Sequence, residues 1–228
     1  YKRQIIYNTR KKICGYYFIK KNAMQNKKLA KHLLSVKAVE LRPNNPFTWA
    51  SGIKSPIYCD NRQLLSYPKI RTFLKKCFVN YIKENYPNVE VIAGVATGAI
   101  AIGALVADEL KLPFVYVRAK AKEHGRQNLI EGKIEPKTKI VLIEDLISTG
   151  GSSISAIDAL VEAETEPLGL IAIFSYGFKV ATANFQKNGF KFDTLTNFDT
   201  LIKVALKYKY LLSDDLVIIQ EWHKKFSS

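Results

Sequence analysis

The sequence predicts an α/β fold with an open, mostly parallel central sheet flanked by helices. Strand-like apolar segments alternate with helix-like amphipathic segments along residues 67–176, and this alternation is typical of parallel strands joined by right-handed crossovers. Lys139–Ile143 (KIVLI) is also a nearly continuous apolar run, as expected for a strand that is buried on both faces. A single sheet covered by helices accounts for both observations.

The first half of the chain contains a hairpin, a helix, a strand and a second helix. Phe47–Asp60 alternates around Ser51 and Gly52 like a hairpin. Apolar residues then recur at intervals of three and four over residues 67–86, which indicates an amphipathic helix. The apolar segment VEVIAGVA predicts a strand ending at Gly94, and the Gly/Ala-rich residues 99–110 predict a helix that packs closely on the sheet.

The second half continues the alternation and then leaves it. PFVYV (residues 113–117) predicts a strand, whereas residues 118–133 are polar, contain two glycines and predict a long mobile loop. Further elements follow: the strand at 139–143, a helix at 152–163, a strand at 168–176 and two helices within 197–226. In such folds ligands bind beyond the carboxyl ends of the strands, so the hairpin and the C-terminal helices are expected to form a lid there.

Composition and charge limit the class of protein. Of 228 residues, 47% are hydrophobic and 24% charged, and no apolar run approaches the roughly 20 residues of a membrane-spanning helix. We therefore expect a soluble protein without a membrane partner. Cys14, Cys59 and Cys77 lack CxxC spacing, which indicates neither a disulfide framework nor a zinc site and fits a reducing, cytoplasmic location.

The positive charge is concentrated at the N-terminus. The net charge is +15, and residues 1–34 hold ten Lys/Arg and no acid. Residues 1–23 fit a transit peptide, a nucleic-acid-binding arm, or an extension upstream of a start at Met24, the only methionine. We favour the extension, so nucleic acid is not an expected partner. Residues 24–228 are then one domain, with hood elements at about 24–66, a core at about 67–195 and C-terminal helices at about 197–226.

The segment Val141–Ser152 carries the chemistry. An apolar strand is followed by Glu144 and Asp145 and then by a loop rich in Ser, Thr and Gly before a helix. Backbone N–H groups in such a loop bind phosphate, and adjacent acids suit ribose hydroxyls and hydrated Mg2+. The alternative is an ordinary turn with Ser152 as the helix cap, but such a turn needs no acid pair. Neither a Walker motif nor GxGxxG is present.

Four segments resemble a known family. VLIEDLISTGGS resembles the 5-phosphoribosyl 1-pyrophosphate (PRPP) signature of type I phosphoribosyltransferases. Three others are similar to elements of orotate phosphoribosyltransferases, in the same chain order: the hairpin FTWASGIKSPIYCDNR, the pyrophosphate loop GVATGA and the mobile catalytic loop YVRAKAKEHGRQNLIEG. The chain departs from many relatives at Ala50, Gly98 and Ala119, where those carry lysine.

The resemblance implies Mg2+-dependent transfer of ribose 5-phosphate from PRPP to orotate, giving orotidine 5′-monophosphate and pyrophosphate, by a homodimer that shares its mobile loops. It implies that Arg118, Lys122, His124 and Asp145 are catalytic. It assigns PRPP binding to Glu144, Asp145, Ser148, Thr149, Gly150, Gly151, Ser152, Arg118, Lys120, Lys122, His124, Thr97 and Gly98. It assigns orotate to Lys54, Arg62 and Thr149, with Mg2+ held mainly by PRPP near Glu144 and Asp145. The alternatives are a purine phosphoribosyltransferase and a PRPP-sensing regulator that binds nucleic acid.

Overall fold

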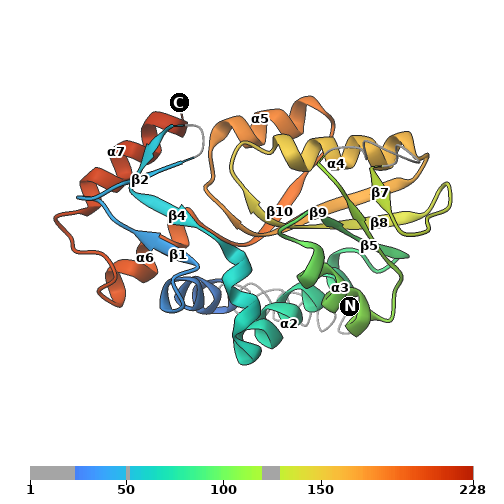
Figure 1. The fold of residues 1–228 in the computed structure, drawn as a ribbon, viewed down its shortest axis with the longest axis horizontal. Coiled ribbons are helices and arrows are strands. Elements are labelled where there is room, and N and C mark those ends of the chain that lie inside the picture. Colours follow the sequence, from blue (N-terminus) through green and yellow to red (C-terminus); the bar gives the residue numbers. More distant parts are fainter. Residues whose placement is uncertain (1–23, 50–51, 120–128, 228) are drawn as a thin grey trace, which may run out of the picture.

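A six-stranded sheet forms the centre of the computed structural model, which describes residues 24–49, 52–119 and 129–227 (Figure 1). The spatial order of the strands is β10 (Phe192–Asn197), β9 (Glu166–Ser175), β8 (Lys139–Ile147), β5 (Val91–Val95), β6 (Phe114–Val117) and β7 (Ile130–Glu131). The first five are parallel, and only the short edge strand β7 is antiparallel to its neighbour. The predicted fold class is therefore confirmed.

Helices cover both faces of the sheet. In Figure 1, α2 (Pro68–Asn85) and α3 (Ile100–Leu110) lie below it, and α4 (Gly151–Glu162) and α5 (Lys179–Lys187) lie above it. Successive residues of β8 point to opposite faces: Val141 and Ile143 join the core that contains α2 and α3, whereas Ile140 and Leu142 join the core that contains α4 and α5. All four are fully buried, and each contributes about 1.5–3 kcal/mol to folding.

A second group of elements lies beside the sheet. It contains the antiparallel pairs β1 (Val39–Leu41) with β4 (Ile57–Cys59) and β2 (Phe47–Thr48) with β3 (Lys54–Ser55). It also contains α6 (Phe198–Lys207) and α7 (Leu216–Ser227). From here on, the hood means these six elements; it differs from the hood predicted at about 24–66 because it includes α6 and α7. The short 3-10 helix η1 (Asn61–Ser66) and a helix over residues 24–35 complete the fold.

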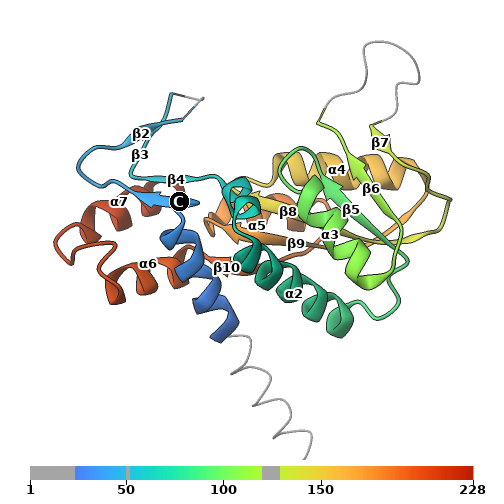
Figure 2. The same cartoon turned by 60° about the horizontal axis from the view of Figure 1, so that its bottom comes forward.

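Aromatic side chains join the hood to the sheet. The ring of Trp49, next to β2, lies 5.7 Å from both Tyr176, which follows β9, and Trp222 of α7. Trp222 Nε1 also donates a hydrogen bond to the backbone oxygen of Lys54 at 3.1 Å. The hairpin β2–β3 is thus packed against the C-terminal helix, near the carboxyl end of β9. In Figure 2 this hairpin and the β6–β7 pair project to the same side of the molecule.

Several sequence predictions need correction. β8 runs on to Ile147 instead of ending before the acid pair. Part of the predicted loop at 118–133 is the strand β7, because Ile130 and Glu131 pair with the edge of β6. The sequence does not predict α5, β10 or the helix over residues 24–35; α5 and β10 contain many polar residues and lack a strong periodic pattern.

Among the described helices, none combines the length and apolar character needed to cross a membrane.

Candidate active site

The acid pair lies where β8 extends beyond its neighbour. Ile143 is opposite Gly94 of β5, and β5 ends one residue later, so Glu144 and Asp145 lie next to the loop that follows β5. The strands β5, β6, β8, β9 and β10 are parallel, and their carboxyl ends therefore meet at one edge. This edge is where open α/β sheets bind ligands.

Asp145 lies directly against the loop at residues 96–99. A Cβ atom added to Gly98 would come within 2.3 Å of the Asp145 carboxyl carbon, so a larger residue here would require the Asp145 side chain to turn to another position. On its other side, Asn61 Nδ2 donates a hydrogen bond to the Asp145 backbone oxygen at 2.6 Å. The structure therefore brings together three separate parts of the chain around Asp145: η1, the loop after β5, and β8.

The side chain of Glu144 is turned into the protein. It is 4% exposed, and its two carboxylate oxygens accept hydrogen bonds from Ser153 Oγ at 2.8 Å and from the Asp145 backbone N–H at 3.0 Å. Burial raises the pKa of the Glu144 carboxyl well above its usual range, and the neighbouring charge of Asp145 raises it further. Glu144 connects β8 to the first turn of α4, and its predicted contact with ribose stays a prediction.

Replacing Glu144 with glutamine should change how stability depends on pH. The raised pKa means that the folded protein holds the carboxyl proton more tightly than the unfolded chain, so wild-type stability falls as pH rises above the usual glutamate range. The free energy of unfolding of the Glu144→Gln variant should fall less over the same range. Urea denaturation of the metal-free protein at several pH values measures this slope; Asp158→Asn, an exposed acid on α4, should leave it unchanged.

The turn from β8 into α4 is shaped for an anion. Gly150 is the N-cap residue, with a φ of 83°, and a Cβ added there would lie 2.7 Å from the ring of Phe185. No side chain caps this end of α4, which leaves the first backbone N–H groups of the helix for a ligand. Ser152 does not cap the helix, as the alternative of an ordinary turn would have it, but lies in its first turn. Ser152, Thr149 and Gly151 are exposed, while Ser148 is half-buried.

The loop after β5 is fixed at both ends. Ala96 donates its backbone N–H to the Val117 oxygen at 2.8 Å, and Ala99 donates to the Val95 oxygen at 3.1 Å. Thr97 is exposed and Gly98 is half-buried between these anchors. The predicted PRPP residues Thr97, Gly98 and Asp145 are therefore adjacent in space.

The two cations predicted for orotate differ in their surroundings. Arg62 forms two hydrogen bonds with the Asp60 carboxylate, at 2.7 and 3.1 Å; these raise the pKa of Arg62, with a smaller contribution from the charge of Asp145. Lys54 lies on the hairpin, where its ammonium group donates to Thr48 Oγ1 at 2.7 Å. The charge of Asp145 therefore acts on Arg62, whereas Lys54 is held on the β2–β3 hairpin by its hydrogen bond to Thr48.

Arg118 lies at the start of the predicted catalytic loop. Its backbone N–H donates to the Leu129 oxygen at 2.8 Å, and its guanidinium lies 3.4 Å from Glu131 Oε1. The β6–β7 pairing therefore holds the two ends of this segment together. Lys120, Lys122 and His124 lie outside the described residues, and their predicted roles stay predictions.

Asn61 is a site residue that the sequence analysis did not identify. Its side chain is 2% exposed and forms the hydrogen bond that links η1 to Asp145. The only local signal was its position beside Asp60 and Arg62 at the end of the hairpin motif. A contact between residues 84 positions apart has no periodic pattern by which to find it.

Asn61→Ala should lower the free energy of unfolding by about 1–2 kcal/mol, because it removes a buried hydrogen bond and leaves the Asp145 carbonyl without its donor. Asn44→Ala is the matched control: Asn44 Nδ2 also donates across the fold, to Asp215 Oδ1 at 2.9 Å, but on the exposed surface. Its loss should be below about 0.5 kcal/mol. If urea denaturation gave equal losses of unfolding free energy for the two variants, the buried Asn61 hydrogen bond would contribute no more to stability than the exposed Asn44 hydrogen bond.

The described residues supply few metal ligands. Among them, no group of three or more His, Cys, Asp or Glu side chains is arranged to hold a metal ion. Glu144 is engaged internally, which leaves Asp145 as the carboxylate at the loop after β5. A single carboxylate fits a Mg2+ ion that keeps several waters and is bound mainly by substrate phosphates.

Comparisons with known proteins agree with this geometry. The phosphoribosyl transferase domain family matches residues 61–201. The chain is 53% identical over 198 residues to the orotate phosphoribosyltransferase of Porphyromonas gingivalis, covering 87% of this chain and 94% of that protein. It is 54% identical to the orotate phosphoribosyltransferase of Listeria innocua, covering 87% of this chain and 95% of that protein.

Solved structures show the same architecture. The orotate phosphoribosyltransferase of Aeropyrum pernix matches with a TM-score of 0.70 and 25% identity, covering 81% of this chain and 99% of that one. The UMP synthase of Leishmania donovani matches with a TM-score of 0.74 and 26% identity over 88% of this chain, which spans 42% of that longer chain.

Proposed function

The chain belongs to the orotate phosphoribosyltransferases, and from this premise we propose how its residues carry out the transfer of ribose 5-phosphate to orotate in UMP biosynthesis. The observation that carries the proposal is that the Asp145 carboxylate of β8 lies against Gly98 of the loop after β5, while the same strand leads into the open N-terminal turn of α4. The substrate PRPP has an anion at each end of its ribose. These two loops offer one anion site each, with a carboxylate between them for the ribose hydroxyls.

The protein's contribution is to hold the reactants and stabilise the departing charge. The bond from the anomeric carbon to pyrophosphate breaks with its electron pair going to the pyrophosphate oxygen, a bond from that carbon to N1 of orotate forms, and the N1 proton is released. The backbone N–H groups at the start of α4 bind the 5-phosphate, with Ser148, Thr149 and Ser152 beside them. Thr97 and Gly98 receive the pyrophosphate, and Arg118, Lys122 and His124 add positive charge as it leaves.

Orotate is assigned to the hood side of the site. It carries a carboxylate, for which Arg62 and Lys54 are the candidate partners. The Arg62 side chain is 59% exposed even though it is paired with Asp60, so its guanidinium has N–H groups free to bind a second anion. Ala50, where many relatives have lysine, lies outside the described residues.

We assign Mg2+ as the cofactor, bound mainly by the oxygens of PRPP and by Asp145. When bound, the ion neutralises the charge that develops on pyrophosphate. The Asp145 carboxylate accepts hydrogen bonds from the ribose hydroxyl groups and so orients the ribose. Gly98, which has no side chain, leaves space for the carboxylate in this position. We also propose a cytoplasmic homodimer in which the segment that contains Lys122 acts in the site of the partner subunit.

One assay tests the proposal directly. The fall in orotate absorbance on addition of PRPP should require the enzyme and should stop when EDTA removes Mg2+. Hypoxanthine and adenine in place of orotate should give no reaction. Activity with a purine but not with orotate would overturn the choice of base, and full activity in EDTA would overturn the choice of cofactor.

A further inference from the structure

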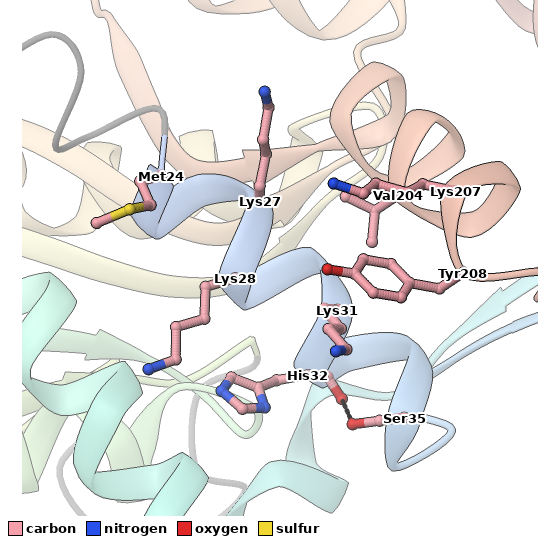
Figure 3. Close-up of a pocket in the computed structure, with 9 residues that line it drawn as sticks. All are labelled: Met24, Lys27, Lys28, Lys31, His32, Ser35, Val204, Lys207 and Tyr208. Carbon is pink, nitrogen blue, oxygen red and sulfur yellow. Dashed lines mark hydrogen bonds between the residues drawn. The ribbon is translucent and has the colours of Figure 1, made fainter.

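A cavity of about 580 Å3 lies between the helix over residues 24–35 and α6 (Figure 3). It shares no lining residue with the site around Asp145. Its walls carry four lysines, Lys27, Lys28 and Lys31 from one helix and Lys207 from the other, together with His32 and Tyr208. No Asp or Glu lines it. The cavity is therefore a strongly basic hollow that the transfer reaction does not explain.

The positive charge of this cavity is not neutralised locally. The ion pairs found among the described residues include none of its four lysines. Instead, Lys28 Nζ lies 4.8 Å from the ring centre of Phe73, and Lys31 Nζ lies 4.1 Å from that of Tyr208. Burial lowers the pKa of His32, and the charges of Lys28 and Lys31 lower it further. A bound anion would reduce this repulsion.

Ordinary helix electrostatics explain only part of the cluster. Lys207 is in the last turn of α6, where a cation interacts favourably with the helix dipole. Lys27, Lys28 and Lys31 precede the last turn of the described helix at 24–35, so the dipole gives no reason for them.

The shape and lining of the cavity indicate the kind of anion. Its volume lies within the range of small-molecule sites. Lysine ammonium groups bind phosphates as point charges, and Tyr208 together with Met24 and Val204 gives an aromatic and apolar wall for the body of a ligand. Tyr208 is 44% exposed and Met24 is 68% exposed, so both surfaces are accessible.

We propose that this cavity is a nucleotide-binding site, separate from the catalytic site, that holds the phosphates with Lys27, Lys28, Lys31 and Lys207 and packs the base or sugar against Tyr208. A hollow with its cations on two facing helices favours a compact polyphosphate. An extended nucleic-acid strand would instead need a continuous basic face. Figure 3 shows the lysine side chains spread around the hollow, and their flexible stems allow the ammonium groups to turn toward a ligand.

Calorimetric titration of the full chain with uridine 5′-triphosphate tests this site. The same titration is run with a loop variant, Thr149→Ala/Ser152→Ala, altered at the start of α4, to detect any binding at the catalytic site. We expect the triphosphate to bind, inorganic tripolyphosphate to bind more weakly, and uridine not to bind. The double variant Lys28→Ala/Lys31→Ala should raise the Kd at least tenfold and leave kcat unchanged. Lys203→Ala, an exposed lysine of α6 outside the cavity, is the matched control and should bind like wild type.

Three results would overturn the proposal. Loss of triphosphate binding in the loop variant Thr149→Ala/Ser152→Ala, with binding kept in the double lysine variant, would place binding in the catalytic site. The double variant might bind as tightly as the Lys203 control, which would exclude the cavity. Finally, a short single-stranded RNA might bind more tightly than the triphosphate and lose affinity in the double variant, which would identify the cavity as part of a nucleic-acid surface. Thermal unfolding of each variant confirms that the fold is intact.

Discussion

Replacing Lys122 with alanine should lower kcat by about 10²- to 10³-fold, the usual cost of removing one well-placed donor to a developing negative charge. Lys122 lies outside the described residues, but it belongs to the segment that begins at Arg118, and Val117 just before that segment accepts a hydrogen bond from Ala96 of the loop after β5. The fold and the KM for orotate should change little. Steady-state kinetics measure the effect, with Lys133→Ala as control: Lys133 is 91% exposed and pairs with Glu135 at 3.0 Å.

The same residue tests whether the sites are shared between subunits. A heterodimer of one Lys122→Ala subunit and one Asp145→Asn subunit contains one site with both defects and one with neither, if Lys122 acts in the partner's site. Mixed dimers should then recover up to half of the wild-type activity, whereas each variant alone should be nearly inactive. Verified heterodimers without any recovered activity would show that Lys122 acts within its own subunit.

The Gly98→Ala variant should lower kcat/KM for PRPP by about 10²-fold. The added Cβ would lie 2.3 Å from the carboxyl carbon of Asp145, which is far inside any allowed contact, so the carboxylate must leave the position proposed for binding the ribose. A displacement of about 1 Å in a catalytic constellation typically costs 10²-fold in rate. Kinetics with varied PRPP, alongside thermal unfolding, separate this effect from a loss of stability.

A double-mutant cycle makes the Gly98 prediction specific. If the methyl group acts by displacing Asp145, then Gly98→Ala should have little further effect in an Asp145→Ala background. Additive effects of the two changes would instead show that Gly98 acts on pyrophosphate independently of Asp145. Either way, the cycle isolates the contact seen between these two residues.

The sequence predicted the parts of the site that are continuous in the chain. The strand β8 was visible as an apolar run, and the acid pair and glycine loop that follow it needed no knowledge of the rest of the fold. The contact of Asp145 with Gly98 and its hydrogen bond from Asn61 were not visible. They depend on β8 being paired with β5 in one register, and long-range register is not encoded in local periodicity.

The errors have the same physical origin. The sequence analysis ended the strand at Ile143 because the next two residues are charged, yet β8 continues to Ile147, since β9 supplies backbone partners along its whole length. Likewise, β10 (FDTLTN) has few apolar residues, and it is a strand because β9 offers an edge to pair with. Tertiary pairing overrides local propensity at both places.

The aromatic contact between Trp49 and Trp222 also sets the order in which a newly made chain can complete its site. The hairpin β2–β3 is synthesised early, but its packing partner Trp222 of α7 follows Lys54 by 168 residues. Because chains emerge from the ribosome N-terminus first, the loops after β5 and β8 are released before the hairpin can pack on α7. The hairpin therefore gains its aromatic contacts only after the strand that carries Asp145 has been made.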